Sequence, residues 1–283
     1  MASCLKPLRD NEFDPDNPNK AYLTGIITTP YGKAKDCKVK LLTFDHKLYD
    51  STFSDAEGRY EFFHIDPGIY KIMAFAPYYL PAEYYPESIS AGTSDTVDLY
   101  FSAMLFNFDS DTVGTIEPFD FKRVIGDWQV QNDNSAPSPP HIYNCFSPHG
   151  LALYNPTLEN FSIGIDFKIN TLPDTVSQVG VVLRLQDSFN YYTVSVSRIM
   201  LSFCKIVDGN LTIIDAVPIL LVHNAWYELW VDVFDDQFKV FFNDELKIDK
   251  TDDTFKEGKT GLLVEREGQN PISVNFDNVV ICR

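Results

Sequence analysis

A chain of 283 residues is long enough for about two domains, each with its own hydrophobic core. The formal net charge of -17 argues against nucleic acid and anionic membrane surfaces as partners, because both would repel the protein. No apolar run approaches the ~20 residues that span a bilayer, so the sequence predicts no membrane insertion. With 22 Phe and 15 Tyr, many β-branched residues and no sustained helical periodicity, the chain is predicted to be all-β.

The N-terminus and the cysteines do not identify the cellular compartment of the protein. The N-terminus lacks an apolar signal core, which fits either a cytoplasmic protein or one whose signal has been removed. The five cysteines are an odd number without a CxxC pair or zinc-ligand spacing, so we expect mostly buried free thiols. They are Cys4, Cys37, Cys145, Cys204 and Cys282.

Residues 1–19 are polar and rich in Asp and Pro, which predicts a flexible arm. Residues 20–103 then give short strands at 21–29, 37–44, 60–65, 69–76 and 96–104, separated by Gly- and Pro-containing turns. In order, Thr24-Gly25-Ile26 and the segments 54–62 and 66–70 resemble the carboxypeptidase regulatory-domain-like family. That resemblance implies a transthyretin-like β-sandwich without catalysis, acting as a spacer or adhesion module. It also implies an extracellular or cell-surface location, with other surface proteins among the partners.

Residues 104–283 contain more than ten predicted strands, which is typical of a large antiparallel sandwich or jelly roll. Strands are expected at 106–111, 121–130 and 238–247 among others, and residues 132–140 form a Pro- and Ser-rich loop. Residues 180–197 predict a β-hairpin with its turn at 187–190.

Strict alternation places polar groups and one ring on a single face of this hairpin. The groups are Arg184, Gln186, Tyr191 and Thr193. Hydroxyl partners beside an aromatic ring suit a sugar, whereas a solvated outer sheet face explains the same pattern without a ligand. Trp128 and Tyr143 could add a stacking ring from nearby loops.

The motif order in residues 104–283 resembles the concanavalin A-like lectin/glucanase superfamily. The nearest branches are laminin-G-like domains, levan-binding-type modules and domains related to 3-keto-disaccharide hydrolases. The motifs are Asp127-Trp128, 161–167, the hairpin, 205–209, 226–229, 258–261 and 276–279. The resemblance implies a jelly roll holding one structural Ca²⁺, with Asp277 as a ligand and Asp109 or Asp111 as a second. The alternative for Asp277 is a hydrogen bond to a neighbouring turn.

Catalysis is not predicted. Glucanases of this superfamily carry a Glu-x-Asp-x-x-Glu arrangement, and the sequence has only Glu228-x-x-x-Asp232 and Glu265-x-Glu267. Glu228, Trp230 and Asp232 share a face, which we attribute to a solvated outer sheet surface. The sequence therefore predicts a non-catalytic carbohydrate-binding or adhesion protein that recognises neutral glycans. The alternatives are a structural subunit of a surface layer, fibre or assembly, and a glycoside hydrolase-like enzyme.

Overall fold

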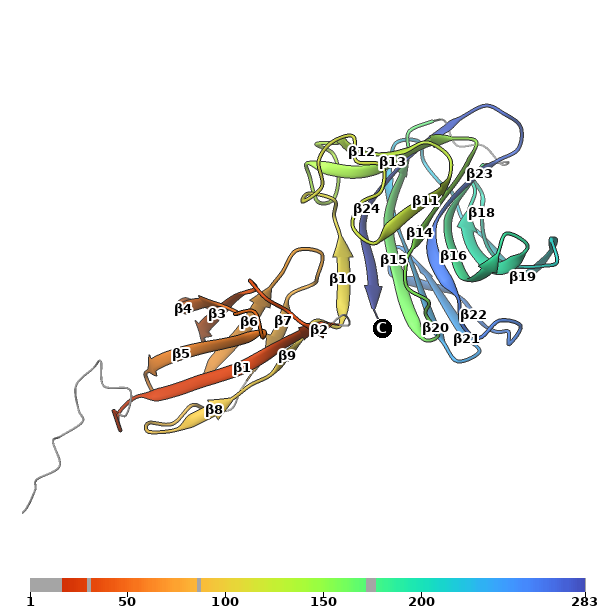
Figure 1. Ribbon diagram of the computed structural model, residues 1–283. Coiled ribbons are helices and arrows are strands. Elements are labelled where there is room, and N and C mark those ends of the chain that lie inside the picture. Colours follow the sequence, from red (N-terminus) through yellow and green to blue (C-terminus); the bar gives the residue numbers. More distant parts are fainter. Residues whose placement is uncertain (1–16, 30–31, 86–87, 172–176, 283) are drawn as a thin grey trace, which may run out of the picture. The chain divides into compact units, whose positions relative to one another are not determined.

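The computed structural model describes residues 17–29, 32–85, 88–171 and 177–282 (Figure 1). Within these ranges the chain forms 24 strands and no helix, which confirms the predicted all-β class. No helix there is long and apolar enough to cross a bilayer. The chain divides into two compact units, Met1–Met104 and Leu105–Arg283. Most of the predicted arm at 1–19 lies outside the described residues.

Unit 1 consists of two sheets that enclose one core. The first sheet has the order β2-β1-β5, with β8 and β9 also pairing with β1, and the second has the order β4-β3-β6-β7. Leu23 and Ile27 of β1 and Val39 and Leu41 of β3 are all fully buried between them. The bounds are β1 (Ala21–Thr29), β2 (Gly32–Lys33), β3 (Lys38–Thr43), β4 (Leu48–Phe53), β5 (Arg59–Ile65), β6 (Tyr70–Phe75), β7 (Ala82–Tyr84), β8 (Ser94–Thr96) and β9 (Leu99–Tyr100). The resemblance of this unit to the carboxypeptidase regulatory-like family stays a prediction.

Unit 2 contains an eight-stranded sheet with the order β12-β13-β24-β15-β20-β21-β22, in which β10 also pairs with β24. Inward-facing residues such as Ile163, Leu229 and Val231 are fully buried. The bounds are β10 (Ala103–Phe106), β12 (Trp128–Asn132), β13 (His141–Ser147), β15 (Phe161–Ile169), β20 (Trp226–Phe234), β21 (Gln237–Phe242), β22 (Glu245–Thr251) and β24 (Ile272–Cys282).

The second sheet of unit 2 has seven strands in the order β11-β14-β23-β16-β17-β18-β19. Tyr192 and Phe203 of this sheet pack against Phe238 of the other, with ring centroids 4.9 Å and 4.8 Å away, so the two sheets share one core. The bounds are β11 (Phe121–Ile125), β14 (His149–Tyr154), β16 (Ser177–Asp187), β17 (Asn190–Val196), β18 (Met200–Val207), β19 (Asn210–Pro218) and β23 (Lys259–Arg266). This pair of antiparallel sheets is consistent with the predicted jelly-roll sandwich.

Two predicted strands of unit 2 are each divided by a turn with positive φ. The stretch 121–130 breaks at Gly126 (φ 89°), so that β11 lies in one sheet and β12 in the other. A Cβ at Gly126 would lie 2.6 Å from the carbonyl oxygen of His149, so only glycine fits this turn. The stretch 238–247 breaks at Asn243 and Asp244 (φ 47° and 64°), which join β21 to β22.

Two further strand predictions need correction. The strand expected at 106–111 ends with β10 at Phe106, because Phe108 adopts a positive φ of 61°. The segment 96–104 is divided among β8, β9 and β10. The strands β2, β4, β7 and β13 have no counterpart among the predicted strands.

Candidate functional site

The outer face of the eight-stranded sheet carries polar and aromatic side chains where β15 and β20 pair. In β20 the residues that alternate with the buried Leu229 and Val231 are Glu228, Trp230 and Asp232, and all three are half-buried. Their partners across the strand pair are Asp166, Gly164 and Ser162 of β15. The predicted common face of the β20 residues is therefore an outer face.

Trp230 lies directly over the glycine opposite it. A Cβ built on Gly164 would be 2.2 Å from Cε3 and 2.6 Å from Cζ3 of the indole, so the six-membered ring covers the bare backbone. The indole Nε1 donates to Asp232 Oδ1 at 2.6 Å, and Ser162 Oγ donates to the same oxygen at 2.6 Å. These contacts fix the ring against the sheet, with one face toward Gly164 and the other directed outward.

The outward side of this ring lines a hollow. The hollow has a volume of about 370 Å³, and we call it the Trp230 hollow; its lining residues are Glu228, Trp230, Asp232, Phe241 and Asp244. A second hollow of about 510 Å³ also has Asp232 in its lining and extends past Lys239 and Gln237. Phe241 pairs with Trp230 and Lys239 pairs with Asp232 across β20 and β21, so the two hollows adjoin along one strand pair.

Negative charge accumulates at one end of the Trp230 hollow. Partial burial, reinforced by the carboxylates of Asp244 and Asp166, raises the pKa of Glu228. Burial also raises the pKa of Asp166, against a lowering effect of the hydrogen bond from Asn278. Asp166 pairs with Glu228 on one side and with Asp277 of β24 on the other, so three carboxylates form a row across three strands.

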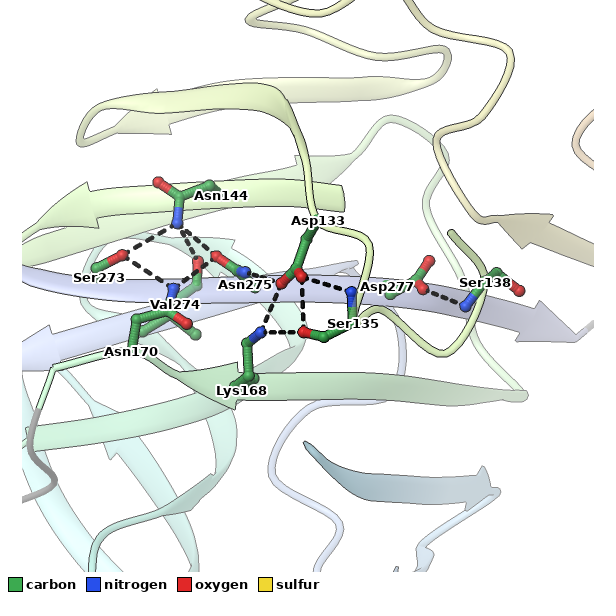
Figure 2. Close-up of polar contacts among 10 residues, drawn as sticks. All are labelled: Asp133, Ser135, Ser138, Asn144, Lys168, Asn170, Ser273, Val274, Asn275 and Asp277. Carbon is green, nitrogen blue, oxygen red and sulfur yellow. Dashed lines mark hydrogen bonds and ion pairs between the residues drawn. The ribbon is translucent and has the colours of Figure 1, made fainter. Parts of the chain in front are cut away.

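Next to this row, a network of polar side chains holds the 133–140 loop on the sheet (Figure 2). Asp133 Oδ2 accepts bonds from Lys168 Nζ at 2.5 Å and Asn275 Nδ2 at 2.8 Å. Burial raises the pKa of Asp133, but the bonds from Lys168 and Ser135 outweigh it and hold that pKa at about 2. Asn144 extends the network to Asn275 Oδ1 at 2.7 Å. Because these groups satisfy one another, we interpret the network as structural.

Two of the three carboxylates expected to bind Ca²⁺ accept hydrogen bonds, whereas the buried Oδ2 of Asp111 has no hydrogen-bond partner among the described residues. Asp277 is fully buried, and its two oxygens accept the backbone N–H groups of Ser138 and Asn278, each at 2.8 Å. Asp109 accepts bonds from the backbone of His141 and the side chain of Asn107. In the described part of the chain Asp277, Asp109 and Asp111 are not gathered into a group of three metal-ligating side chains. The contacts of Asp277 favour the loop-bonding role given above as its alternative, and the calcium site stays a prediction.

The two rings proposed for stacking are in the core. Trp128 is 2% exposed and Tyr143 is 0% exposed, because both face inward from β12 and β13. Their centroids are 4.9 Å apart, and Trp128 also stacks on Phe276. Trp128 Nε1 donates to the carbonyl of Ile125, and Tyr143 Oη donates to that of Ile116. Neither ring is available to a sugar.

The structure also places Arg184 elsewhere than the sequence predicts. The hairpin β16–β17 forms as expected, with Asp187 paired to Asn190, but the register shifts between Leu183 and Asp187. Arg184 lies in this irregularity with φ 48° and is fully buried. Its guanidinium donates to the carbonyl oxygens of Glu159 (2.7 Å from Nη2) and Phe255 (2.9 Å from Nη1). It is a structural tie and does not lie on a ligand-binding face.

The remaining predicted residues do not form a polar face either. Thr193 is 7% exposed, and Gln186 is exposed but donates through Nε2 to the carbonyls of Arg184 and Glu257. Tyr191 is half-buried in a small apolar cluster of the seven-stranded sheet. The cluster's other members are Leu151, Leu153, Val182, Leu185 and Leu263, and all of these except Leu153 help line a hollow of only about 80 Å³.

No family model matches the sequence, and no curated protein is similar to it. Among solved structures, the chain is similar to a carbohydrate-binding module from Bacillus subtilis, with 21% identity, 58% of this chain and 96% of that chain covered, and a TM-score of 0.48. It is similar to a Bacillus licheniformis β-glucanase, with 10% identity, coverage of 64% and 98%, and a TM-score of 0.46. For the cellulose-induced protein Cip1 the identity is 12%, the coverage 63% and 96%, and the TM-score 0.48. A binding module and a glucanase both occur among them, so binding and catalysis must be distinguished by this chain's own residues.

Proposed function

We propose that unit 2 is a non-catalytic carbohydrate-binding module whose ligand occupies the Trp230 hollow. The observation that carries the proposal is the indole of Trp230, lying on Gly164 with carboxylates at its edge. Sugar rings combine an apolar face, which stacks on aromatic rings, with hydroxyl groups that donate to carboxylates. This site replaces the hairpin face that the sequence predicts.

The affinity expected from such a site is modest. Each hydrogen bond to a sugar hydroxyl replaces one to water, so its net contribution is only ~1 kcal/mol. A few such bonds and one stacking contact correspond to micromolar to millimolar dissociation constants, or roughly 4–8 kcal/mol of binding free energy.

The spacing of Glu228 and Asp232 argues against cleavage by this pair of carboxylates. Glu228 and Asp232 are four residues apart on one strand, which at ~3.3 Å per residue separates them by about 13 Å. Glycosidases need their two carboxyl groups ~5–5.5 Å apart for retention or ~6.5–9.5 Å apart for inversion. Asp232 is in addition held by Trp230 and Ser162.

One observation favours a glycoside hydrolase as the second candidate. Asp166 faces Glu228 directly across the β15–β20 pair, and the pKa of each carboxyl is raised. A raised pKa is what a general acid needs. However, Asp166 is not in the lining of the hollow and accepts a bond from Asn278 at 2.9 Å.

A glycan array followed by calorimetry with the full-length protein tests the proposal. We expect binding that Trp230→Ala removes and that Phe189→Ala, which truncates a 61% exposed ring on the other sheet, leaves unchanged. Absence of binding across the array would refute a carbohydrate-binding role and favour the structural-subunit alternative. Reducing sugar released by the wild type and not by Glu228→Gln would identify a hydrolase.

For unit 1 we propose the role of a spacer or interaction module, in a protein that acts outside the cell or at its surface. Support comes from the resemblance of this unit to the carboxypeptidase regulatory-like family and from its separate hydrophobic core. Removing unit 1 should then leave the glycan affinity of unit 2 unchanged. A loss of affinity on removal would mean that unit 1 takes part in the site.

A further inference from the structure

We infer that the Trp230 hollow selects saccharides that carry protonated amino groups. This inference rests on the proposed function and names the ligand class of the same site. It differs from the neutral glycan that the sequence predicts, because the lining residues offer a neutral sugar only part of what it needs.

The side chains that line the hollow accept hydrogen bonds and donate none. Its three polar side chains are the carboxylates of Glu228, Asp232 and Asp244, which are acceptors only when ionised. The one N–H donor, Trp230 Nε1, is already bonded to Asp232. A sugar hydroxyl both donates and accepts, whereas an ammonium group has three donors and no acceptor, so it matches this lining better.

The charge in the hollow also lacks a counterion among its lining residues. Lys239 is the cross-strand partner of Asp232 but lines the adjoining hollow and not this one, and Lys168 is bound to Asp133. Repulsion from Asp244 and Asp166 contributes to the raised pKa of Glu228. A cation bound here would relieve that repulsion, whereas an acidic or sulfated sugar would increase it.

The aromatic residues of the hollow favour a cation as well. Trp230 and Phe241 face each other across β20 and β21, and both line the hollow. Indole gives the strongest cation–π interaction of the protein side chains. A ring face for the sugar and acceptors for its ammonium group are thus present in one hollow.

The test compares three oligosaccharides of equal length by calorimetry with the full-length protein. They are an oligomer of glucosamine, its fully N-acetylated form and a neutral glucose oligomer. We expect the glucosamine oligomer to bind at least tenfold more tightly than the other two at low salt. Its advantage should shrink as ionic strength rises, because salt screens the charge attraction.

Variants assign the effect to the hollow. Glu228→Gln and Asp244→Asn should each weaken binding of the glucosamine oligomer several-fold. They should affect the neutral oligomer much less, because the amide oxygen still accepts a hydroxyl group. Trp230→Ala should weaken both. Glu265→Gln, at an exposed carboxylate on the seven-stranded sheet, is the matched control and should change neither.

The possible failures are distinguishable. Equal affinity for all three oligomers, lost in Trp230→Ala, would overturn the amine preference and leave the carbohydrate site intact. A preference for the glucosamine oligomer that survives both Glu228→Gln and Asp244→Asn would overturn the assignment to this hollow. Binding of none of the three, together with an empty glycan array, would refute the proposed function itself.

Discussion

Asp277 and Ser138 are 139 residues apart in the chain, and the carboxylate Oδ2 of Asp277 accepts the backbone N–H of Ser138 at 2.8 Å (Figure 2). Asp277 is buried beneath the loop that contains Ser138. The bond holds the loop in place, and it requires a buried carboxyl group. The free energy of unfolding should therefore depend on pH.

Burial raises the pKa of Asp277 to about 7, against the lowering effect of the Ser138 and Asn278 backbone bonds, with Asp166 and Asp109 adding to the increase. A folded-state pKa above the unfolded value means that the folded state binds the proton more tightly. Stability should therefore decrease as pH rises from about 4 to about 7 and level off above, by an amount of the order of 4 kcal/mol at 1.36 kcal/mol per pKa unit.

Asp277→Asn should remove this decrease. Its amide has one acceptor oxygen for the two backbone N–H groups, so the variant should be less stable than the wild type at pH 4, and the difference should shrink or reverse at pH 8. Urea unfolding midpoints at both values measure it. Carboxylates with a lowered pKa, such as Asp133 at about 2, act with the opposite sign and only below about pH 4. A wild-type midpoint that does not change between pH 4 and pH 8 would contradict the prediction.

Calcium is expected to leave the melting temperature unchanged. Each oxygen of Asp277 already accepts one backbone N–H group, so an ion would have to share these oxygens with the loop. Thermal melts in EDTA and in millimolar calcium, on the wild type and on Asp277→Ala, measure the effect. An increase in melting temperature that Asp277→Ala abolishes would show that the loop rearranges around a metal.

Gly164→Ala should weaken glycan binding about as much as Trp230→Ala does. The new Cβ would approach Cε3 of Trp230 to 2.2 Å, so the indole must leave its position. Tryptophan fluorescence should change at the same time. Gly68→Ala is the control, since its Cβ would come no closer than 3.2 Å to a neighbouring ring atom. Unchanged affinity in Gly164→Ala would mean that the ring's position does not matter.

Arg184→Met should destabilise unit 2 without touching the Trp230 hollow. The carbonyl oxygens of Glu159 and Phe255 would lose bonds from a charged donor, at ~1.5–3 kcal/mol each. We expect a loss of roughly 2–5 kcal/mol in chemical unfolding. The exposed Arg198 offers a matched control, because Arg198→Met should change stability by only about 0.5 kcal/mol. Equal unfolding midpoints for the two variants would mean that the hydrogen bonds of Arg184 do not stabilise unit 2.

Alternation of apolar residues predicted most strands of unit 2 because period 2 reflects burial of one sheet face. It failed at Gly126, Asn243 and Arg184, where residues with positive φ interrupt the pleat, whereas the strands that contain His64 and Asn278 continue past a positive φ. At Arg184 the register shift breaks the alternation of side-chain directions. The side chain predicted to contact a ligand is therefore buried.

The candidate site could be found only in part from the sequence. The common face of Glu228, Trp230 and Asp232 is visible in the alternation of β20. Whether this face forms a binding site depends on Gly164 and Phe241, the cross-strand partners of Trp230. They lie 66 and 11 positions away from Trp230 in the sequence. A glycine within the apolar strand at 161–169 was the available signal, because such a glycine often marks close approach of another group.

The turn at Asn243 and Asp244 forms one side of the hollow, and its residues can be exchanged without disturbing a paired strand. Asp244 belongs to this exposed connection between β21 and β22, whereas Trp230 and Glu228 belong to a strand that is paired on both sides. Connections tolerate insertion and exchange far better than paired strands do. During divergence, a few altered turn residues can therefore change which ligand is preferred while the indole platform is inherited unchanged.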